Sequence, residues 1–463
     1  MSRLVVVSNR VADLRKATQS GGLAVAIADA LKARGGVWFG WDGNTLEDET
    51  EKLGVDRVGD VDVISSPLTV EDYSQYYIGY ANSVLWPLFH YRIDLVDYRP
   101  QYFEGYMRVN DKFASLLKPF LKQRDMVWVH DYHLIPFAER LRALGCRQKT
   151  GFFLHIPFPP PDILAASPNH AYLVEALLSY DVVGFQTSTD LNNFNRYVEE
   201  NMPDSMGPDG VIMHGGRTVR AIRLPIGIDV AQFTELAEKT FEDINIDHMR
   251  RAILGQRQIV GVDRLDYSKG IPERFEAFSR MLYLHPELEK SVTFLQIAPP
   301  TREDVTAYSE IRMKLEGLAG SINGKFGDID WVPIRYIHRP VPRPRLAAMF
   351  RSSEVGLVTP LRDGMNLVAK EYVAAQNPAD PGVLVLSQFA GAAEELGDAL
   401  IVNPHDTEEM GEKMELALRM PLEERQNRHA SLLKRVKESD VGIWMSSFID
   451  ELEAAEAQGG AAS

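Results

Sequence analysis

The stretch EVGLVTPLRDGMNLVAKEYVAAQ, residues 354–376, joins a short apolar run to an amphipathic segment through the turn sequence Asp-Gly-Met-Asn. The apolar run, which includes Val355 and Val358, predicts a buried strand, and the segment 367–376 predicts a helix. The first turn of a helix leaves backbone N–H groups without intrahelical partners, and such a turn suits an anion. Two acids, Asp363 and Glu371, flank this helix start. The stretch is therefore either a simple capped helix with an acid near its start or part of a binding site.

Short apolar runs alternate with longer amphipathic segments along most of the chain. The runs predicted as strands are residues 4–9, 37–41, 61–65, 126–130, 151–156, 181–185, 257–263, 292–298, 331–337, 354–360, 382–387 and 399–404. Apolar strands separated by helices indicate parallel sheets that are covered on both faces. The sequence therefore predicts the α/β class with doubly wound sheets, in which ligands bind at the carboxyl ends of the strands.

The length and one break in the pattern predict the domain organisation. A chain of 463 residues exceeds one ordinary hydrophobic core, so we expect two domains. The alternation weakens between about residues 201 and 250, where turn residues gather. We therefore predict an N-terminal domain at 1–228 and a C-terminal domain at 229–440. Residues 441–463 should form a helix that returns to the N-terminal domain, followed by a frayed tail.

Composition excludes several classes of protein. The apolar content of 45% and the charged content of 25% are those of a globular protein. A net charge of −15 argues against a nucleic-acid partner, which needs a basic surface. The opening MSRLVVVSNR lacks the long apolar core of a signal peptide, and no apolar run is long enough to span a membrane. The single cysteine, Cys146, cannot form an internal disulfide, so we expect a cytoplasmic protein without a membrane partner.

Common cofactor and metal motifs are missing from the sequence. It contains no G-x-G-x-x-G, no P-loop, no H-E-x-x-H and no paired C-x-x-C. His130 and His133 in VHDYH have no suitable cluster of further ligands, so a structural role at a strand end is the better interpretation. We expect neither a metal nor a cofactor.

Charged and polar side chains follow several of the predicted strands. Arg264 and Lys269 in GVDRLDYSKGI could clamp a diphosphate opposite the helix start at 364–368, with Arg as the planar fork and Lys as the point charge. Each cation alone could equally be a solvated surface charge. Further candidates are Arg10, Asp131, His155 and Arg302 at other strand ends and the pair Gly21 and Gly22, which opens a helix. His155 could equally be a satisfied core histidine.

Eight segments taken together resemble the trehalose-6-phosphate synthases. They are VVVSNR, GGLAVAI, VLWPLFHYR, VHDYHL, FFLHIPFP, GVDRLDYSKGIPERF, PLRDGMNLVAKEYVAAQ and GVLVLSQFAGAAEEL, and they occur in order between about residues 3 and 450. The resemblance implies the GT-B architecture, which has two facing Rossmann-like domains. It also implies retaining transfer of glucose from UDP-glucose, or another nucleotide-glucose, to glucose 6-phosphate. The products would be α,α-trehalose 6-phosphate and the nucleoside diphosphate, with no further domain to remove the phosphate.

The resemblance also assigns a role to each candidate residue. It implies that Arg264 and Lys269 bind the donor diphosphate and that Asp363 binds hydroxyls of the transferred glucose. It implies a ribose contact for Glu371 and contacts to sugar and phosphate for the helix start. The implied donor-binding set is Gly22, His155, Arg264, Lys269, Asp363, Met365, Asn366, Leu367, Val368 and Glu371. The implied acceptor-binding set is Arg10, Tyr77, Trp86, Asp131 and Arg302, and the catalytic set is Arg264, Lys269, His155 and Asp131.

Retention by double displacement needs a carboxylate nucleophile near the bond that breaks. Because the resemblance gives Asp131 and Asp363 binding roles, we expect a front-face route in which the leaving phosphate accepts the proton of the acceptor hydroxyl. Glucosylglycerol-phosphate synthases and pseudoglycosyltransferases are alternatives within this class. A sugar-nucleotide epimerase and a non-catalytic sugar-phosphate sensor are alternatives outside it. We also expect a homo-oligomer.

Overall fold

The computed structural model describes residues 2–14, 27–28, 31, 34–48, 53–207, 211–241, 256–301 and 305–455. It divides into two compact units. Unit 1 comprises Met1–Pro225 and Gly442–Ser463, and unit 2 comprises Ile226–Val441. The predicted division was at residues 228 and 229, and each unit is described by itself below.

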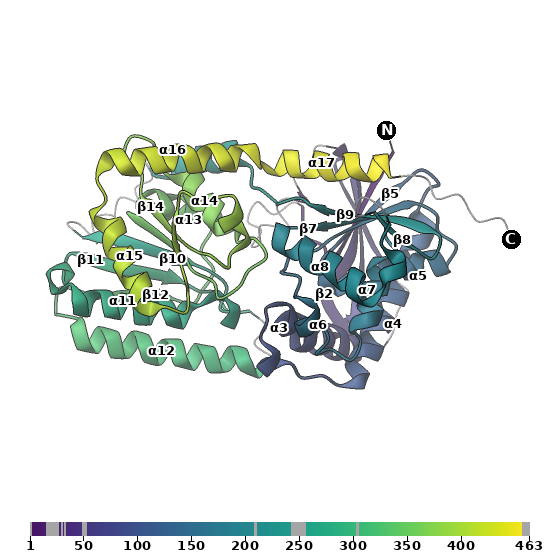
Figure 1. The fold of residues 1–463 in the computed structure, drawn as a ribbon, viewed down its shortest axis with the longest axis horizontal. Helices are drawn as coiled ribbons and strands as arrows, with labels where there is room; N and C mark the ends of the chain where they lie inside the picture. The colour runs from purple at the N-terminus through teal and green to yellow at the C-terminus, as the bar shows by residue number, and fades with distance from the viewer. Residues whose placement is uncertain are drawn as a thin grey trace. The chain divides into compact units, whose positions relative to one another are not determined.

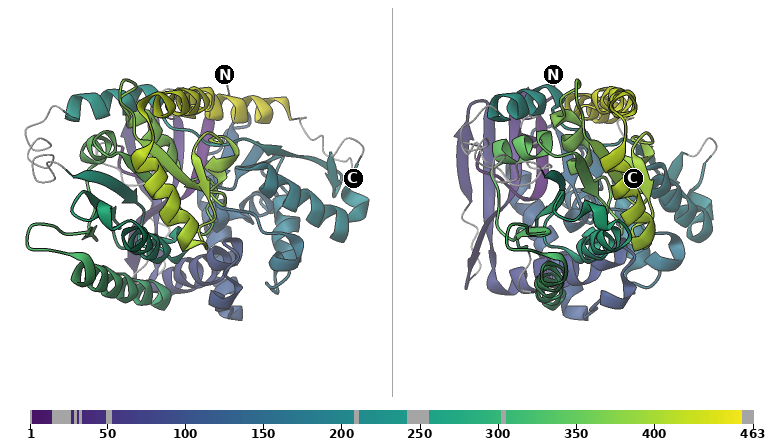
Figure 2. Two further views of the ribbon diagram at one scale, coloured as in Figure 1. Left: turned by 60° about the vertical axis from the view of Figure 1, so that its left-hand side comes forward. Right: turned by 90° about the vertical axis from the view of Figure 1, so that its left-hand side faces the viewer.

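Unit 1 is built on a nine-stranded sheet in the order β3-β4-β2-β1-β5-β6-β7-β9-β8. The strands are β1 (Leu4–Arg10), β2 (Gly36–Leu46), β3 (Gly54–Val58), β4 (Val61–Thr69), β5 (Met126–His130), β6 (Lys149–Phe153), β7 (Val182–Phe185), β8 (Ile212–His214) and β9 (Arg217–Arg223). The edge strands β3 and β8 are antiparallel to their neighbours, and the other pairs are parallel. The early strands of this sheet, in purple and blue, lie side by side in Figure 2.

The helices of unit 1 connect these strands. They are α2 (Val70–Asp72), the π-helix η1 (Tyr73–Leu85), α3 (Trp86–Phe89), α4 (Pro100–Leu117), α5 (Phe137–Ala143), α6 (Pro161–Leu164), α7 (His170–Leu177), α8 (Ser188–Asn201) and α17 (Val441–Ala454). Residues from Gly442 onward belong to unit 1 because α17 packs on its sheet. Trp444 of α17 lies 4.9 Å from Trp128 of β5 between ring centroids, and both rings are buried.

Unit 2 contains a six-stranded parallel sheet in the order β12-β11-β10-β13-β14-β15. The strands are β10 (Arg257–Val262), β11 (Val292–Ile297), β12 (Ile334–Ile337), β13 (Val355–Val358), β14 (Val383–Ser387) and β15 (Leu400–Val402). Its helices, several of which are labelled beside the sheet in Figure 1, are α9 (Val230–Phe241), α11 (Ile271–Leu284), α12 (Thr306–Phe326), α13 (Arg343–Arg351), α14 (Leu367–Ala375), α15 (Thr407–Arg419) and α16 (Leu422–Glu438). Numbered from its own first strand, this sheet has the order 3-2-1-4-5-6, which is the doubly wound dinucleotide-binding order.

Each strand expected from the apolar runs is confirmed, although the ends differ. The run 331–337 was too long, because only Ile334–Ile337 pair as β12 and Pro333 just before it has no N–H to donate. Three strands were not expected, namely β3, β8 and β9. The last two lie in the region 201–250 that we took for a break in the pattern, and β9 was missed because it is largely polar.

Candidate functional site

In a doubly wound sheet, ligands bind at the switch point, where two neighbouring strands are followed by connections that run in opposite directions. In unit 2 this switch point lies between the neighbouring strands β10 and β13. The segment 263–270 follows β10, and the segment 359–366 follows β13. The parallel core of unit 1 has the same order, with β1 and β5 adjacent, so Arg10 at the end of β1 and Asp131 just after β5 lie at the carboxyl ends of the two central strands there. These candidates thus lie at positions where doubly wound folds bind ligands.

The loop after β10 is held tightly against the end of β13. Asp266 accepts hydrogen bonds from the backbone N–H and the hydroxyl of Ser268, each at 2.9 Å, and caps the short helix Tyr267–Lys269. Gly270 has a φ of 64°, and a Cβ there would lie 2.4 Å from the carbonyl oxygen of Thr359. A side chain at position 270 would therefore separate the two loops, so glycine is required by sterics as well as by the backbone angle.

Lys269 and Asp363 form a close ion pair at this point. Lys269 Nζ lies 2.5 Å from Asp363 Oδ2, and the two side chains are 9% and 14% exposed. Asn366 Nδ2 donates to the same carboxylate oxygen at 3.1 Å. The backbone of Asp363 is also anchored, since its N–H donates to Phe389 and its carbonyl accepts from Gly391, both at 3.1 Å. The two residues that the family resemblance assigned to phosphate and sugar are therefore adjacent.

The start of α14 offers backbone N–H groups next to this pair. Asn366 precedes the helix with a left-handed φ of 70° and makes no side-chain cap bond. Met365 is buried, and its carbonyl accepts a hydrogen bond of 2.9 Å from Ala392. Leu367 and Val368, which begin the helix, are half-buried. This uncapped start is suited to an anionic ligand.

Two charged residues border this group. Arg264 is exposed at the end of β10. Glu371, one turn into α14, is 17% exposed and lies 3.9 Å from Arg343 Nη2. Burial raises the pKa of Glu371 to about 7, and the Arg343 guanidinium opposes this effect. Sequence reasoning missed Arg343, although its position after β12, within the proline-rich HRPVPRPR, was a usable signal.

In unit 1, aromatic rings form a continuous series that ends at Arg10. The guanidinium of Arg10 lies 5.7 Å from the ring centroid of Trp41, and Trp41 lies 5.5 Å from Tyr77. Tyr77 stacks on His133 at 5.9 Å. The series continues through Tyr132 to Trp86, which is only 4% exposed. Arg10 and Tyr77 are thus brought together near accessible surface, whereas Trp86 lies deeper in the core.

Tyr77 is carried by a rare type of helix. The π-helix η1 spans Tyr73–Leu85, and its second half is held by side chains that reach back along it. Asn82 Nδ2 donates to the carbonyl of Tyr77 at 2.7 Å, and Ser83 Oγ donates to that of Ile78 at 2.8 Å. Backbone of this type is rare and frequently occurs at functional sites.

Asp131 has a strained backbone. Its φ of 76° and ψ of 165° lie in a region that is otherwise almost limited to glycine, and such a conformation costs roughly 1–3 kcal/mol. The carboxylate accepts the backbone N–H of His155 at 3.3 Å, and the N–H of Asp131 donates to Phe153 at 2.8 Å. Strain of this kind persists where the surrounding structure needs it, which supports a functional role for Asp131.

His155 forms a neutral pair with His130. Their ring nitrogens Nε2 and Nδ1 lie 3.0 Å apart, and Gln186 lies 3.4 Å from the other nitrogen of His155. Burial lowers the pKa of His155 to about 3 and also lowers that of His130. Near neutral pH the imidazole of His155 can therefore donate or accept a hydrogen bond but carries no charge.

The remaining candidates Gly22 and Arg302 lie outside the described residues. Among the residues that the structure does describe, no group of three or more His, Cys, Asp and Glu side chains is placed to hold a metal ion. Within the same residues, no helix has both the length and the apolar character needed to cross a membrane.

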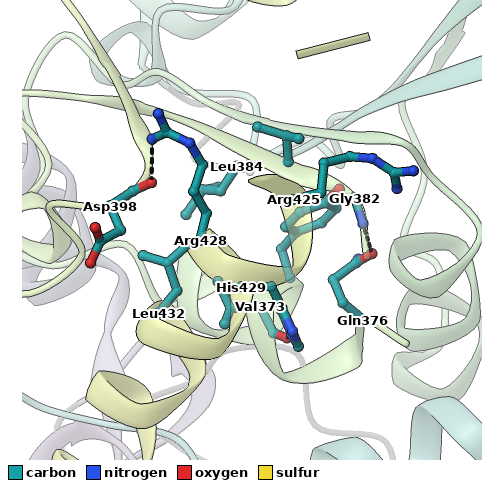
Figure 3. Close-up of a pocket in the computed structure, with 11 residues that line it drawn as sticks. Val373, Gln376, Gly382, Leu384, Asp398, Arg425, Arg428, His429 and Leu432 are labelled. Atoms are coloured by element: carbon teal, nitrogen blue, oxygen red, sulfur yellow. Dashed lines mark hydrogen bonds between the residues drawn. The ribbon is translucent and has the colours of Figure 1, made fainter. Parts of the chain in front are cut away.

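A small cavity in unit 2 is structural. It lies between the end of α14, the start of β14 and the helix α16, and its volume is about 10 Å³, enough for one water molecule at most. Arg428 donates a hydrogen bond of 2.9 Å to the carbonyl of Asp398 (Figure 3). The N–H of Gly382 donates to the side-chain oxygen of Gln376 at 2.8 Å. None of the candidate site residues lines it.

The chain belongs to glycosyltransferase family 20, whose model matches residues 3–454. It is 47% identical over 454 residues to the trehalose-6-phosphate synthase of Cronobacter sakazakii, covering 98% of this chain and 95% of that protein. The α,α-trehalose-phosphate synthase (UDP-forming) of Burkholderia xenovorans, solved in complex with glucose-6-phosphate, superposes with a TM-score of 0.94 at 49% identity, covering 97% of this chain and 100% of the other. An E. coli structure bound with UDP-2-fluoro glucose has a TM-score of 0.92 at 46% identity, covering 98% and 99%.

These comparisons confirm the family resemblance and the enzyme class expected from the eight sequence segments. The fold class, α/β with two Rossmann-like doubly wound domains of the GT-B type, is confirmed as well.

Proposed function

We propose that this protein transfers glucose from UDP-glucose to glucose 6-phosphate with retention, giving α,α-trehalose 6-phosphate and UDP. The observation that carries this proposal is the placement of Lys269, Asp363 and the start of α14 at the switch point of unit 2. Membership of glycosyltransferase family 20 supports it. Relatives solved with glucose-6-phosphate and with UDP-2-fluoro glucose support the choice of substrates.

In this proposal most donor contacts come from unit 2 and most acceptor contacts come from unit 1. Unit 2 binds the donor: Arg264, Lys269 and the N–H groups of α14 hold the diphosphate, Asp363 holds the glucose, and Glu371 holds the ribose. Unit 1 binds the acceptor through Arg10, Tyr77 and Asp131, and Arg302 adds a further contact to its phosphate. The family resemblance assigns His155 and Gly22 to the donor glucose as well, and Trp86, which is buried, supports the acceptor residues.

The chemistry follows from charge. As the glycosidic bond breaks, negative charge grows on the leaving phosphate, and Arg264, Lys269 and the helix start stabilise it. The leaving phosphate takes the proton of the attacking acceptor hydroxyl on the same face, so the configuration is retained. The ion pair with Lys269 occupies Asp363, which argues against that carboxylate as a nucleophile. Neutral His155, whose ring nitrogens lie against His130 and Gln186, takes no proton in this scheme.

The test is an assay that offers UDP-, ADP- and GDP-glucose with glucose 6-phosphate, followed by NMR of the product. We expect UDP-glucose to be the best donor and the new linkage to be α,α. An inverted linkage would contradict the front-face mechanism. If glycerol 3-phosphate were the better acceptor, the protein would be a glucosylglycerol-phosphate synthase. Formation of an epimer from UDP-glucose alone would favour an epimerase. Binding of both ligands without turnover would favour a sensor.

The homo-oligomeric state and the cytoplasmic location stay predictions. Light scattering and cell fractionation test them.

A further inference from the structure

Unit 2 contains a fully buried arginine beneath the loop that carries Lys269. Arg274, in the first turns of α11, has a side chain that is 0% exposed. Its Nη1 donates to Asp263 Oδ2 at 2.5 Å and lies 3.4 Å from Gln296 Oε1. Its Nε donates to Thr359 Oγ1 and its Nη2 to the backbone carbonyl of Lys269, both at 2.9 Å. Burying a charge is costly, so a guanidinium with this many partners indicates a site built around it.

The four partners come from three places at one end of the sheet, because Asp263 and Lys269 both belong to the segment after β10. Asp263 follows β10, Gln296 lies in β11 and Thr359 follows β13. Space for the guanidinium depends on Gly261, because a Cβ at that position would lie 3.2 Å from Arg274 Nη1 and 2.4 Å from Gln296 Oε1. Arg274 therefore links the carboxyl ends of neighbouring strands to the loop that holds Lys269.

The hydrogen bonds close into a ring. From Arg274 they run to Asp263, whose Oδ1 lies 3.4 Å from Asn366 Nδ2. Asn366 donates to Asp363 at 3.1 Å, and Asp363 pairs with Lys269 Nζ at 2.5 Å. The carbonyl of Lys269 returns the ring to Arg274. A displacement of Arg274 would thus be transmitted from two directions to the ammonium group of Lys269.

We propose that Arg274 is a positioning residue for glucosyl transfer, one that sets the backbone of Lys269 directly and the carboxylate of Asp363 through Asp263 and Asn366. This inference rests on the function proposed above. Arg274 lies below the loop and acts on the leaving group only through these residues. Lysine cannot replace it, because an ammonium group lacks the planar fork that reaches several acceptors at once.

The first experiment replaces Arg274 with lysine and measures kcat, the KM for both substrates and the affinity for UDP. We expect kcat to fall about ten- to a hundredfold, because a displacement of a charge-stabilising group by a fraction of an ångström weakens transition-state contacts most. The KM for glucose 6-phosphate should change by less than about threefold, because Arg10, Tyr77 and Asp131, which make most of its proposed contacts, lie in unit 1.

A matched control is Arg142→Lys in unit 1. Arg142 is also largely buried, pairs with Asp181 at 3.0 Å and donates to the carbonyl of Gln148 at 2.7 Å. We expect this variant to lose stability while kcat stays within about twofold of the wild type. A similar kcat loss in both variants would mean that Arg274 has only a general structural role.

A double-mutant cycle distinguishes positioning from structure more sharply. If Arg274 acts through Lys269, adding Arg274→Lys to Lys269→Ala should lower kcat by less than about threefold beyond the single Lys269→Ala variant. Should Arg274→Lys fail to fold, Asp263→Asn takes its place in the same cycle, since it keeps the volume and an acceptor but removes the charge. Multiplicative losses, or a folded Arg274→Lys enzyme with near wild-type kcat, would overturn the proposal. An inactive wild type would instead overturn the proposed function itself.

Discussion

The ammonium group of Lys269 lies against Asp363 with little exposure to solvent, so its position is set before any ligand arrives. Such preorganisation is what makes a cation effective against developing charge, since no reorganisation is needed as the bond breaks. Arg264 is exposed and would supply the second cation from the edge of the loop.

Lys269→Ala and Arg264→Ala should each lower kcat about a hundredfold, the equivalent of roughly 3 kcal/mol, with a much smaller change in the KM for glucose 6-phosphate. Steady-state kinetics with both substrates measures this. Lys290→Ala is the control, because Lys290 pairs with Asp328 at an exposed position in the same unit and should leave kcat unchanged. Near-full turnover in either site variant would show that the diphosphate is held elsewhere.

Glu371 should make donor binding depend on pH. Because its pKa is raised to about 7, the carboxylate becomes protonated as the pH falls from about 8 to 6 and loses an acceptor for the ribose hydroxyls. Calorimetry with UDP-glucose, whose diphosphate does not titrate in this range, should show that the Kd rises as the pH falls. Glu371→Gln should bind more weakly, with a higher donor KM, little change in kcat and no such pH dependence. An equal slope in the variant would assign the titration to another group.

The same shift has a consequence for stability. Glu371 titrates near its ordinary value of 4.5 in the unfolded chain and near 7 in the folded one, so the folded state binds the extra proton between these values. The contribution of Glu371 therefore lowers the free energy of unfolding as the pH rises from about 4.5 to 7, and Glu371→Gln should remove that part of the slope.

Arg10 should contribute to the preference of the enzyme for glucose 6-phosphate over free glucose. We expect free glucose to be a poor acceptor, with a lower kcat and a higher KM than glucose 6-phosphate. The reason is that binding energy from the phosphate helps to orient the reacting hydroxyl. Arg10→Ala should narrow the ratio of kcat/KM for glucose 6-phosphate over glucose, and Arg302→Ala should do the same. An unchanged ratio in both variants would place the acceptor phosphate away from these arginines.

At the scale of elements, close packing determines which positions tolerate a side chain. The segment after β9 passes the end of α16 so closely that a Cβ on Gly227 would lie 1.7 Å from the carbonyl oxygen of Ser439. By contrast, Gly320 in α12 has open space where a Cβ would point. The first glycine is required by sterics, whereas the second only weakens its helix.

Gly227→Ala should therefore destabilise the protein by about 3 kcal/mol or more, because backbone has to move to relieve the overlap. Gly320→Ala should stabilise it by about 0.5–1 kcal/mol through helix propensity. Thermal unfolding of both variants measures the contrast. Equal effects of the two alanines would mean that the segment at Gly227 can shift without cost.

At the scale of the whole molecule, the parallel cores of the two units share one strand order. In each sheet the connections reverse at the central pair of strands. Arg10 and Asp131 in unit 1, and Arg264, Lys269 and Asp363 in unit 2, lie at the carboxyl ends of that pair. This supports the proposed division, in which unit 2 supplies most contacts to the donor and unit 1 most contacts to the acceptor.

Hydrogen exchange in the intact protein can check this division. UDP-glucose alone should slow exchange in residues 263–270 and 363–371, since bound ligand opposes local opening there. Glucose 6-phosphate alone should slow exchange around residues 76–86 and 131–133. Helix α12, which carries none of the proposed contacts, is the internal control. Protection of 363–371 by glucose 6-phosphate alone would contradict the assignment.

The local pattern of the sequence was enough to predict the parallel α/β class, because strand and helix periods are encoded by neighbouring residues. It also placed Lys269, Asp363 and Glu371 at strand ends or a helix start. It could not predict the strand order, the ion pair between Lys269 and Asp363, which are 94 residues apart, or the ring closed by Arg274. These features depend on which strands become neighbours in the sheet. Strand order is determined by side-chain packing between segments that are far apart in the sequence, and the local periodicity of the sequence does not encode it.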